Sequence, residues 1–321
     1  MKRPRQSGAA LLAAMLTVSL VATFATAALW NQWRSVEVEA ADRARVQAAW
    51  ILTGALDWSR LILREDARAG GADHLAEPWA VPLQEARLST FLAADPSNTV
   101  ENDADTTFLS GEIVDMQSLL NITSLVEAGR LSEPSLRAFG RLFELLGLPQ
   151  SQLTRLAENL RFASDINVGN LSGGQAPLMP QRLEQLAWLG LPPETIAALQ
   201  PYVTILPVRT AVNLNTAPAE VVYAVGSTLG MADAKRLVAA RESQHFRAVV
   251  DAAKLVPAGA FASGTVDIRS RFFEVRGRLR MDDVVIEERS LVQRDGGNVR
   301  TVQREHGGFQ SASAPQAAPP R

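Results

Sequence analysis

Residues 1–34 read MKRPRQSGAALLAAMLTVSLVATFATAALWNQWR, and this stretch decides how the rest of the chain is organised. A short basic leader ends at Ser7-Gly8, and no charged residue occurs between Arg5 and Arg34. A helix of about 20 apolar residues crosses the roughly 30 Å hydrocarbon core of a bilayer, so residues 9–30 are long enough to span a membrane. Because the basic side chains precede this span, we expect the N-terminus in the cytoplasm and the bulk of the chain outside.

The helical pattern continues beyond the apolar run. Between residues 9 and 65 the chain has no proline and a single glycine, Gly54. Apolar residues such as Trp50 and Ile62 alternate there with charged residues such as Glu37 and Arg43, which is typical of an amphipathic helix. The sequence therefore predicts one continuous helix over residues 9–65, about 80 Å long at 1.5 Å per residue.

Three interpretations of the N-terminal segment compete. A secretory signal peptide would be removed after Ala27, since residues 25–27 fit the A-x-A cleavage pattern. A plain signal anchor would be kept from Met1 onward. A type IV pilin-like signal would be cut after Gly8, between the charges and the apolar run, leaving Ala9 as the mature N-terminus. A removed signal has no reason to continue into an amphipathic helix, so we favour the pilin-like interpretation.

The composition excludes several classes of protein. The chain of 321 residues has a formal net charge of −2 and no cysteine. It therefore has no electrostatic footprint for nucleic acid and no thiol for disulfides, lipid anchoring, metal binding or catalysis. The three histidines, His74, His245 and His306, lie in different segments, and no Gly-rich phosphate loop, HExxH motif or nucleophile elbow is present. We therefore expect a protein that is not an enzyme and has no cofactor.

Strand patterns flank a long helical stretch. Residues 69–102 contain three prolines and predict a loop-rich connection, and residues 106–117 read as a strand followed by a turn. Residues 126–262 are helical in pattern, with one helix starting at residues 132–134 and stopping at Gly147. Residues 271–280 and 284–294 alternate like two strands joined by a turn at residues 281–283, and residues 299–303 could add a third strand. We expect the strand near Glu112 to join this sheet.

Two shorter patterns lie inside the helical stretch. The spacing G-L-P-x-x-x-hydrophobic-x-x-L occurs at Gly147 and again at Gly190, which indicates either a repeated helix-turn-helix unit or a repeated way of starting a helix. The segment Asn213-Leu214-Asn215-Thr216-Ala217-Pro218 precedes a helical hairpin. We expect Thr216 to cap a helix whose first turn holds Pro218, followed by a second helix over residues 233–242.

These features, in this order, resemble the type II secretion pseudopilins and in particular the general secretion pathway protein K family. The resemblance lies in the leader ending at Gly8, the membrane helix, the run at residues 46–50, the segment at residues 74–80 and the motif at residues 213–218. The hairpin also resembles helix-hairpin-helix DNA-binding modules, but it has one glycine and no basic excess. After cleavage the fifth mature residue would be Ala13. Most pilins carry glutamate there, and its absence is a departure shared with protein K, which fits a subunit at the tip of the fibre.

The resemblance implies an α+β fold. A long N-terminal transmembrane and amphipathic helix would pack on a small antiparallel pseudopilin sheet, with a large α-helical (SAM-like or helix-hairpin-helix-like) domain inserted. The expected parts are a basic leader (1–8), the N-terminal helix (9–65, transmembrane about 9–30), the pseudopilin domain (66–125 and 264–305), the helical insert (126–263) and a disordered tail (307–321).

The resemblance also implies partners and a location. Prepilin peptidase would cut after Gly8, Ala9 would be methylated, and the subunit would join minor pseudopilins I and J and the inner-membrane assembly platform. It would start pseudopilus assembly and support export across the outer membrane. Relatives often have an acid-rich loop suited to calcium, for which this chain offers Asp165 and few other carboxylates, so an ordinary turn is favoured there. Two other hypotheses remain: a membrane-anchored periplasmic binding module unrelated to pili, and a secreted protein cut after Ala27.

Overall fold

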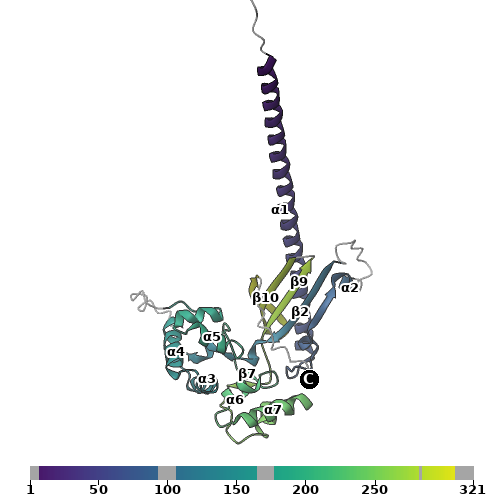
Figure 1. Cartoon of the computed structure of the whole chain (residues 1–321). Helices are drawn as coiled ribbons and strands as arrows, with labels where there is room; N and C mark the ends of the chain where they lie inside the picture. The colour runs from purple at the N-terminus through teal and green to yellow at the C-terminus, as the bar shows by residue number, and fades with distance from the viewer. Residues whose placement is uncertain (1–6, 93–105, 165–176, 282–283, 308–321) are drawn as a thin grey trace, which may run out of the picture. The chain divides into compact units, whose positions relative to one another are not determined.

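The computed structural model describes residues 7–92, 106–164, 177–281 and 284–307. A single helix, α1, runs unbroken over Ser7–Ala69 (Figure 1). Gly70 ends it with a backbone φ of 68°, a left-handed conformation that glycine adopts without steric cost. The prediction of one continuous helix is therefore confirmed.

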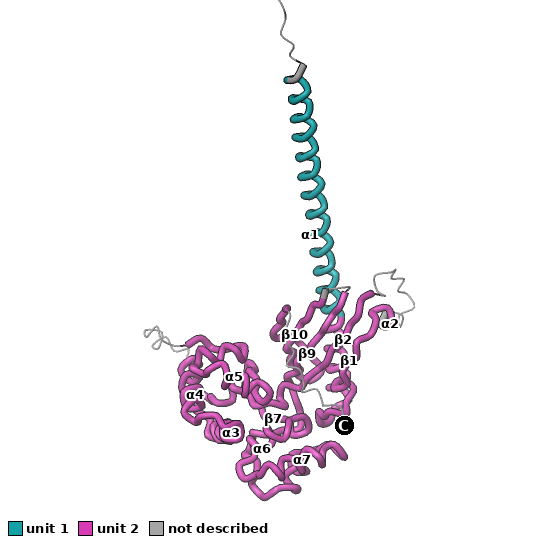
Figure 2. Tube along the Cα trace, viewed as in Figure 1, with its two compact units in different colours: residues 1–54 teal, residues 55–321 magenta. Residues whose placement is uncertain are grey.

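The chain divides into two compact units, Met1–Gly54 and Ala55–Arg321 (Figure 2). The first unit is the N-terminal part of α1. Its apolar residues are exposed, including Leu11, Leu16 and Phe24. An 18-residue window of this helix has a mean hydropathy of 2.0, so α1 is long and apolar enough to cross a membrane. The second unit contains the end of α1, one sheet and the helical region.

The sheet has five antiparallel strands in the order β1-β2-β9-β10-β11. Their bounds are β1 Leu83–Arg87, β2 Thr107–Asp115, β9 Phe272–Met281, β10 Val284–Asp295 and β11 Asn298–His306. β2 lies beside β9, with Glu112 opposite Arg276 and Ile113 opposite Val275. Between these two neighbours the chain makes the whole helical region. The expected strands at residues 106–117, 271–280, 284–294 and 299–303 are confirmed, as is the pairing of the first of them with the terminal hairpin.

The end of α1 packs under one face of the sheet. Leu56 and Leu63 lie in one apolar cluster with Trp79, Phe273, Val275, Val292 and Val299. The side chains of β9 alternate accordingly, because Phe273, Val275 and Leu279 are buried while Arg276 and Arg278 face the other way. The Trp79 and Phe273 rings meet edge to face with centroids 5.1 Å apart, a favourable aromatic geometry.

The helical region folds around a core of its own. Its helices are α3 Glu133–Leu145, α4 Gln150–Ser164, η5 Leu183–Leu189, α5 Pro193–Leu199, α6 Ala219–Val225, α7 Met231–Ser243 and α8 Val249–Ala253. Two short parallel pairs accompany them, β3 (Leu120–Asn121) with β6 (Val203–Thr204) and β7 (Val212–Asn213) with β8 (Val266–Asp267). A two-residue hairpin joins β4 (Val126–Glu127) to β5 (Arg130–Leu131). The core also includes Leu120, Ile122 and Ile268.

The repeated glycine pattern marks two equivalent helix ends. Gly147 and Gly190 both have left-handed backbones, with φ of 67° and 87°. After each glycine the next N–H reaches back to a carbonyl five residues earlier, from Leu148 to Phe143 and from Leu191 to Leu186. Pro149 directly precedes α4, and Pro192 is the N-cap residue of α5. Both segments therefore share a helix stop and a helix start.

The expectation of a loop-rich connection over residues 69–102 is wrong for part of this range. It contains η1 (Pro78–Ala80), β1 and α2 (Leu88–Leu92). β1 is an edge strand with mostly exposed side chains, held to β2 through its backbone. Such a strand has no apolar alternation, so its sequence carries little strand signal. The turn expected at residues 281–283 includes Asp282 and Asp283, which lie outside the described residues.

Candidate functional site: the polar junction between sheet and helical region

The expected processing residues lie at the start of α1. Gly8 and Ala9 are in its first turn, and Ala13 follows within the exposed apolar part of the helix. Gly8 directly precedes the apolar run. Cleavage after Gly8 and the tip-subunit meaning of Ala13 stay predictions.

The second candidate site is the motif at residues 213–218. Asn213 is fully buried, and its side-chain nitrogen lies 3.0 Å from Ser270 Oγ, 3.1 Å from Asp115 Oδ2 and 3.1 Å from the Asp73 carbonyl oxygen. Its Oδ1 accepts from the Asn215 N–H at 2.9 Å. One amide side chain of β7 thus contacts Asp115 at the end of β2, Asp73 in the segment after α1, and Ser270 just before β9.

Asp115 is the acceptor at the centre of this junction. Its Oδ2 receives the hydroxyl protons of Ser270 and Thr216, both at 2.6 Å, and its Oδ1 receives the Gln117 N–H at 2.8 Å. Burial raises the pKa of the Asp115 carboxyl to about 6, although these hydrogen bonds pull the pKa the other way. A carboxylate in this position is stable only because donors surround it.

Thr216 does not cap the following helix, so that expectation is wrong. α6 begins at Ala219 with Pro218 as its N-cap residue, and the Pro218 carbonyl accepts from Val221 and Val222. The Thr216 hydroxyl instead donates to Asp115. A helix start offers N–H donors, and α6 begins three residues after Thr216, so the Thr216 side chain does not reach them and instead serves the contact with the buried carboxylate.

The junction extends to a buried arginine, Arg294 of β10. It donates to Asp66 Oδ2 at 2.6 Å, to Asp73 Oδ1 and to the Ser270 carbonyl at 2.9 Å. Its guanidinium also lies 4.8 Å from the centre of the Phe273 ring. Burial raises the pKa of both Asp66 and Asp73, while Arg294 counteracts the rise. This single cation balances two carboxylates at the end of α1.

Asp66, Asp73 and Glu77 bring carboxylate oxygens within 4.8 Å of one another. Protein donors already occupy this cluster. Arg294 holds the two aspartates, the Ser270 N–H donates to Asp73 at 2.6 Å, and Glu77 Oε2 accepts from the His74 N–H and from Trp79 Nε1, both at 2.8 Å. The arrangement is therefore an ion-pair network. Asp165, the calcium candidate considered from the sequence, lies outside the described residues.

Two of the three histidines meet, which their sequence positions did not indicate. The His74 and His245 rings stack with centroids 3.8 Å apart and planes 11° from parallel. His74 also caps a turn, because its Nδ1 accepts from the Ala76 N–H at 3.3 Å. His306 is elsewhere, 3.2 Å from Glu288. No local pattern could have paired His74 with His245, since the contact depends on the tertiary fold.

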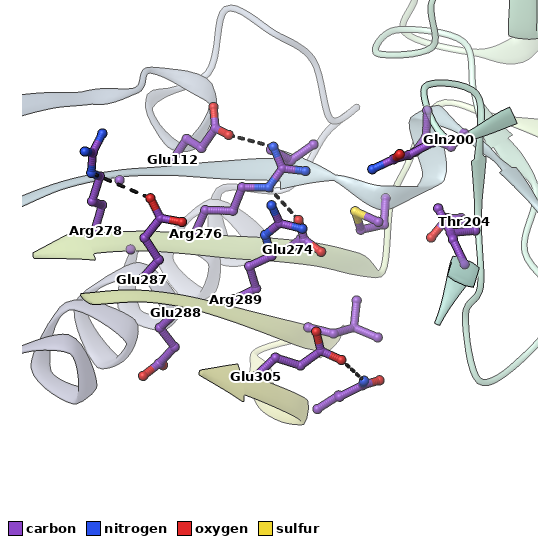
Figure 3. A pocket seen from close by; sticks show the side chains of 18 of the residues that line it. Glu112, Gln200, Thr204, Glu274, Arg276, Arg278, Glu287, Glu288, Arg289 and Glu305 are labelled. Atoms are coloured by element: carbon purple, nitrogen blue, oxygen red, sulfur yellow. Dashed lines mark hydrogen bonds and ion pairs between the residues drawn. The ribbon is translucent and has the colours of Figure 1, made fainter. Parts of the chain in front are cut away.

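The face of the sheet opposite α1 forms a groove of about 910 Å³ against residues 181–184 and 197–205 (Figure 3). Its floor carries ion pairs, with Arg276 bound to Glu112 at 2.8 Å and to Glu274 at 2.5 Å. Arg182 reaches across to Glu305 at 2.6 Å. Figure 3 shows Arg276 directed toward Glu112 and Glu274, and Arg278 toward Glu287. Among the described residues, these charges on the groove floor are therefore held in ion pairs with one another.

The adjacent acids Glu287 and Glu288 of β10 lie in different environments. Glu288 lies on the α1 side of β10 with only 4% exposure, bound by Arg304 at 2.6 Å. Glu287 projects to the groove side, 3.6 Å from Arg278. Adjacent residues of a strand point to opposite faces, so the two acids have different environments.

Comparisons with known proteins agree with this architecture. Two family models described as type II secretion system (T2SS), protein K match residues 118–208 and 212–268. The chain is 25% identical to the type II secretion system protein K of Pectobacterium carotovorum, over 97% of this chain and 99% of that protein. It is also 25% identical to protein K of Pseudomonas aeruginosa, over 95% and 94%.

A solved structure shares the fold. A chain of the GspK-GspI-GspJ complex from the enterotoxigenic Escherichia coli type 2 secretion system superposes with a TM-score of 0.63 and 17% identity. The match covers 84% of this chain and 99% of that chain. The long apolar helix, the sheet and the helical region between β2 and β9, together with these matches, show that the chain belongs to the type II secretion system protein K family.

Proposed function

We propose that this chain is a minor pseudopilin at the tip of the type II secretion pseudopilus. It starts assembly of the fibre and supports protein export across the outer membrane by assembly, not by catalytic turnover. The observation that carries the proposal is the unbroken helix α1, which joins an exposed apolar span to Leu56 and Leu63 beneath the sheet. Removal of a signal after Ala27 would cut through this helix.

Processing follows from the leader. Prepilin peptidase cuts after Gly8, Ala9 becomes the methylated N-terminus, and α1 then holds the subunit in the inner membrane as a single pass. The leader lies in the cytoplasm and the sheet and helical region in the periplasm, which agrees with the basic residues before the span. The proposed parts are residues 1–8, 9–65, 66–125 with 264–305, the insert 126–263, and a C-terminal tail at 307–321.

Ala13 supports the tip position. A carboxylate in the lipid-embedded part of a helix is costly unless it has a partner. A repeating subunit could use such a group to pair with the N-terminal amine of its neighbour. A subunit with nothing above it has no such need, and the methyl group of Ala13 fits that place.

The proposed partners are minor pseudopilins I and J, because the chain with the similar fold was solved in a complex with GspI and GspJ. The inner-membrane assembly platform would contact the growing fibre. Nucleic acid is not a proposed partner, since the net charge is −2. The bulky helical region, built as one insert between neighbouring strands, would cap the fibre rather than accept a further subunit.

N-terminal sequencing of the mature protein tests the proposal directly. Methylated Ala9 is expected after expression with prepilin peptidase, and Gly8→Leu should leave the leader attached. A mature protein beginning at Met1 would favour a membrane-anchored binding module, and one beginning at Ala28 a secreted protein. Co-purification with co-expressed pseudopilins I and J is the second test; absence of any complex would contradict the tip position.

A further inference from the structure

The stacked imidazoles join two segments that are fixed separately. His74 lies between α1 and η1, and His245 lies between α7 and α8. Both side chains are partly exposed, and the ring centroids are 3.8 Å apart. The contact therefore connects the segment that follows the anchor helix with the helical region, at a place that solvent protons can reach.

Each histidine is next in sequence to a residue that is held by buried hydrogen bonds. His74 follows Asp73, whose carboxylate accepts the Ser270 N–H at 2.6 Å. His245 precedes Phe246, whose N–H and carbonyl are both bound by Asn215. The rings cannot move far apart while these hydrogen bonds persist, so any repulsion between them acts on the junction.

The charges around the two rings are unequal. Asp66 of α1 and Asp73 face His74, whereas Arg247 and the His74 ring itself face His245, with Glu77 as the only opposing charge named among the described groups. Burial lowers the pKa of His74, and the two aspartates partly offset it. Burial also lowers the pKa of His245, and His74 and Arg247 lower it further.

We propose that the His74–His245 stack is a proton-sensitive latch between the segment after α1 and the helical region. Two neutral imidazoles stack face to face at this distance. The first proton goes to His74, because Asp66 and Asp73 stabilise its charge. It binds Nδ1, which gives up its 3.3 Å contact with the Ala76 N–H. A second proton, on His245, then places its positive charge against the charged His74 ring and near Arg247. This second step pushes the rings apart and loosens the junction.

The direction with pH follows from proton binding. Both folded-state pKa values lie below that of an unfolded histidine, about 6.5. Between those values the unfolded chain binds more protons than the folded one, so stability falls as the pH falls below about 6.5. The latch is closed at neutral pH and weakened in acid.

The chain has only three histidines, which makes a direct test practical. The full-length protein in detergent, labelled with carbon-13 at the histidine Cε1 position, should give three resolvable signals between pH 8 and pH 5. His74→Gln should raise the titration midpoint of His245 by about one pH unit, because a charge about 4 Å away is removed. The His306 signal, from a ring that pairs with Glu288 away from the stack, should be the same in both proteins and serves as the internal control.

Hydrogen exchange shows whether titration opens the junction. After correction for intrinsic rates, amides in residues 72–80 and 244–248 should exchange at least about threefold faster at pH 5 than at pH 7.5. A threefold change in the opening equilibrium corresponds to a histidine pKa shift of roughly half a unit between the closed and open junction. His245→Phe keeps a stacked ring but removes one titrating group, and it should abolish this acceleration. The proposal is overturned if His74→Gln leaves the His245 midpoint unchanged, or if His245→Phe and the wild-type protein show the same acceleration.

Discussion

Asn215 binds both backbone polar groups of Phe246. Its Nδ2 donates to the Phe246 carbonyl at 2.9 Å, and its Oδ1 accepts from the Phe246 N–H at 2.8 Å. All four groups are buried, and the pair joins the start of the α6 hairpin to the turn after α7. The asparagine side chain thus pairs with the Phe246 backbone in the way that a neighbouring strand would.

Replacing Asn215 by Ala should lower the free energy of unfolding by about 2–4 kcal/mol. The change removes two hydrogen bonds and leaves the buried Phe246 N–H and carbonyl without a partner. Denaturant unfolding of the full chain in detergent, followed by tryptophan fluorescence, to which buried Trp79 contributes, measures the loss. The exposed neighbour Gln244→Ala is the matched control and should change stability by less than about 0.5 kcal/mol. Equal effects of the two substitutions would contradict the role of Asn215.

Asp115→Asn should change the pH dependence of stability. The folded-state pKa of about 6 exceeds the unfolded value of 3.8, so the native protein binds more protons between these values. The Asp115 carboxyl therefore favours the folded state more as the pH falls from above 6 toward 4, by about 3 kcal/mol at most. Asn has no such titration. The difference in unfolding free energy between wild type and Asp115→Asn should accordingly grow toward pH 4; a constant difference from pH 4 to 8 would show that Asp115 does not titrate in this way.

Arg294→Met should cost about 3–5 kcal/mol at neutral pH, because it leaves Asp66 and Asp73 buried beside one another without their cation. Without Arg294 the pKa values of both aspartates rise further above normal. The native state of the variant then takes up protons more readily than the unfolded state, so its deficit should shrink as the pH falls. Arg271→Met is the control, since the Arg271–Asp295 pair is exposed. A deficit independent of pH would argue that Arg294 contributes only packing.

Gly111→Ala should destabilise the centre of the sheet by about 1–3 kcal/mol. A methyl group there would lie 2.7 Å from the Arg276 carbonyl oxygen of the neighbouring strand, and backbone atoms cannot swing away. Gly297→Ala has nothing within 4 Å of the added carbon and should leave stability within about 0.5 kcal/mol of wild type. Thermal unfolding of the two variants side by side distinguishes this close approach from a general effect of losing glycine.

Periodicity predicted the elements whose burial is one-sided. β9 alternates because Phe273 and Val275 face α1 while Arg276 faces the groove, and α1 shows no break because it contains no proline and one glycine. β1 escaped prediction because its side chains are mostly exposed and its backbone alone specifies the pairing. Helices and strands can be predicted from sequence where one face is buried against a core, because the apolar residues then recur with the period of the element. They cannot be predicted in this way where neither face is buried.

The polar junction could be recognised only in part. The Asn-x-Asn-Thr motif stands out in the sequence, but its acceptors Asp115 and Asp73 lie far away in the chain, so local spacing predicts a capping role for Thr216 that the fold does not use. The His74–His245 contact was invisible for the same reason. Hydrogen bonds formed across the fold leave no spacing signal, whereas caps and turns do.

The placement of the helical region between β2 and β9 also has a consequence for how the protein folds. These strands are hydrogen-bonded neighbours, yet nearly half of the chain separates Asp115 from Phe272. Closing so long a loop carries an entropic cost before any strand contact is gained. Compaction of the helical region brings its two ends together and shortens the effective loop. The route to the native sheet therefore passes through the insert, and its rate should respond to substitutions far from any strand.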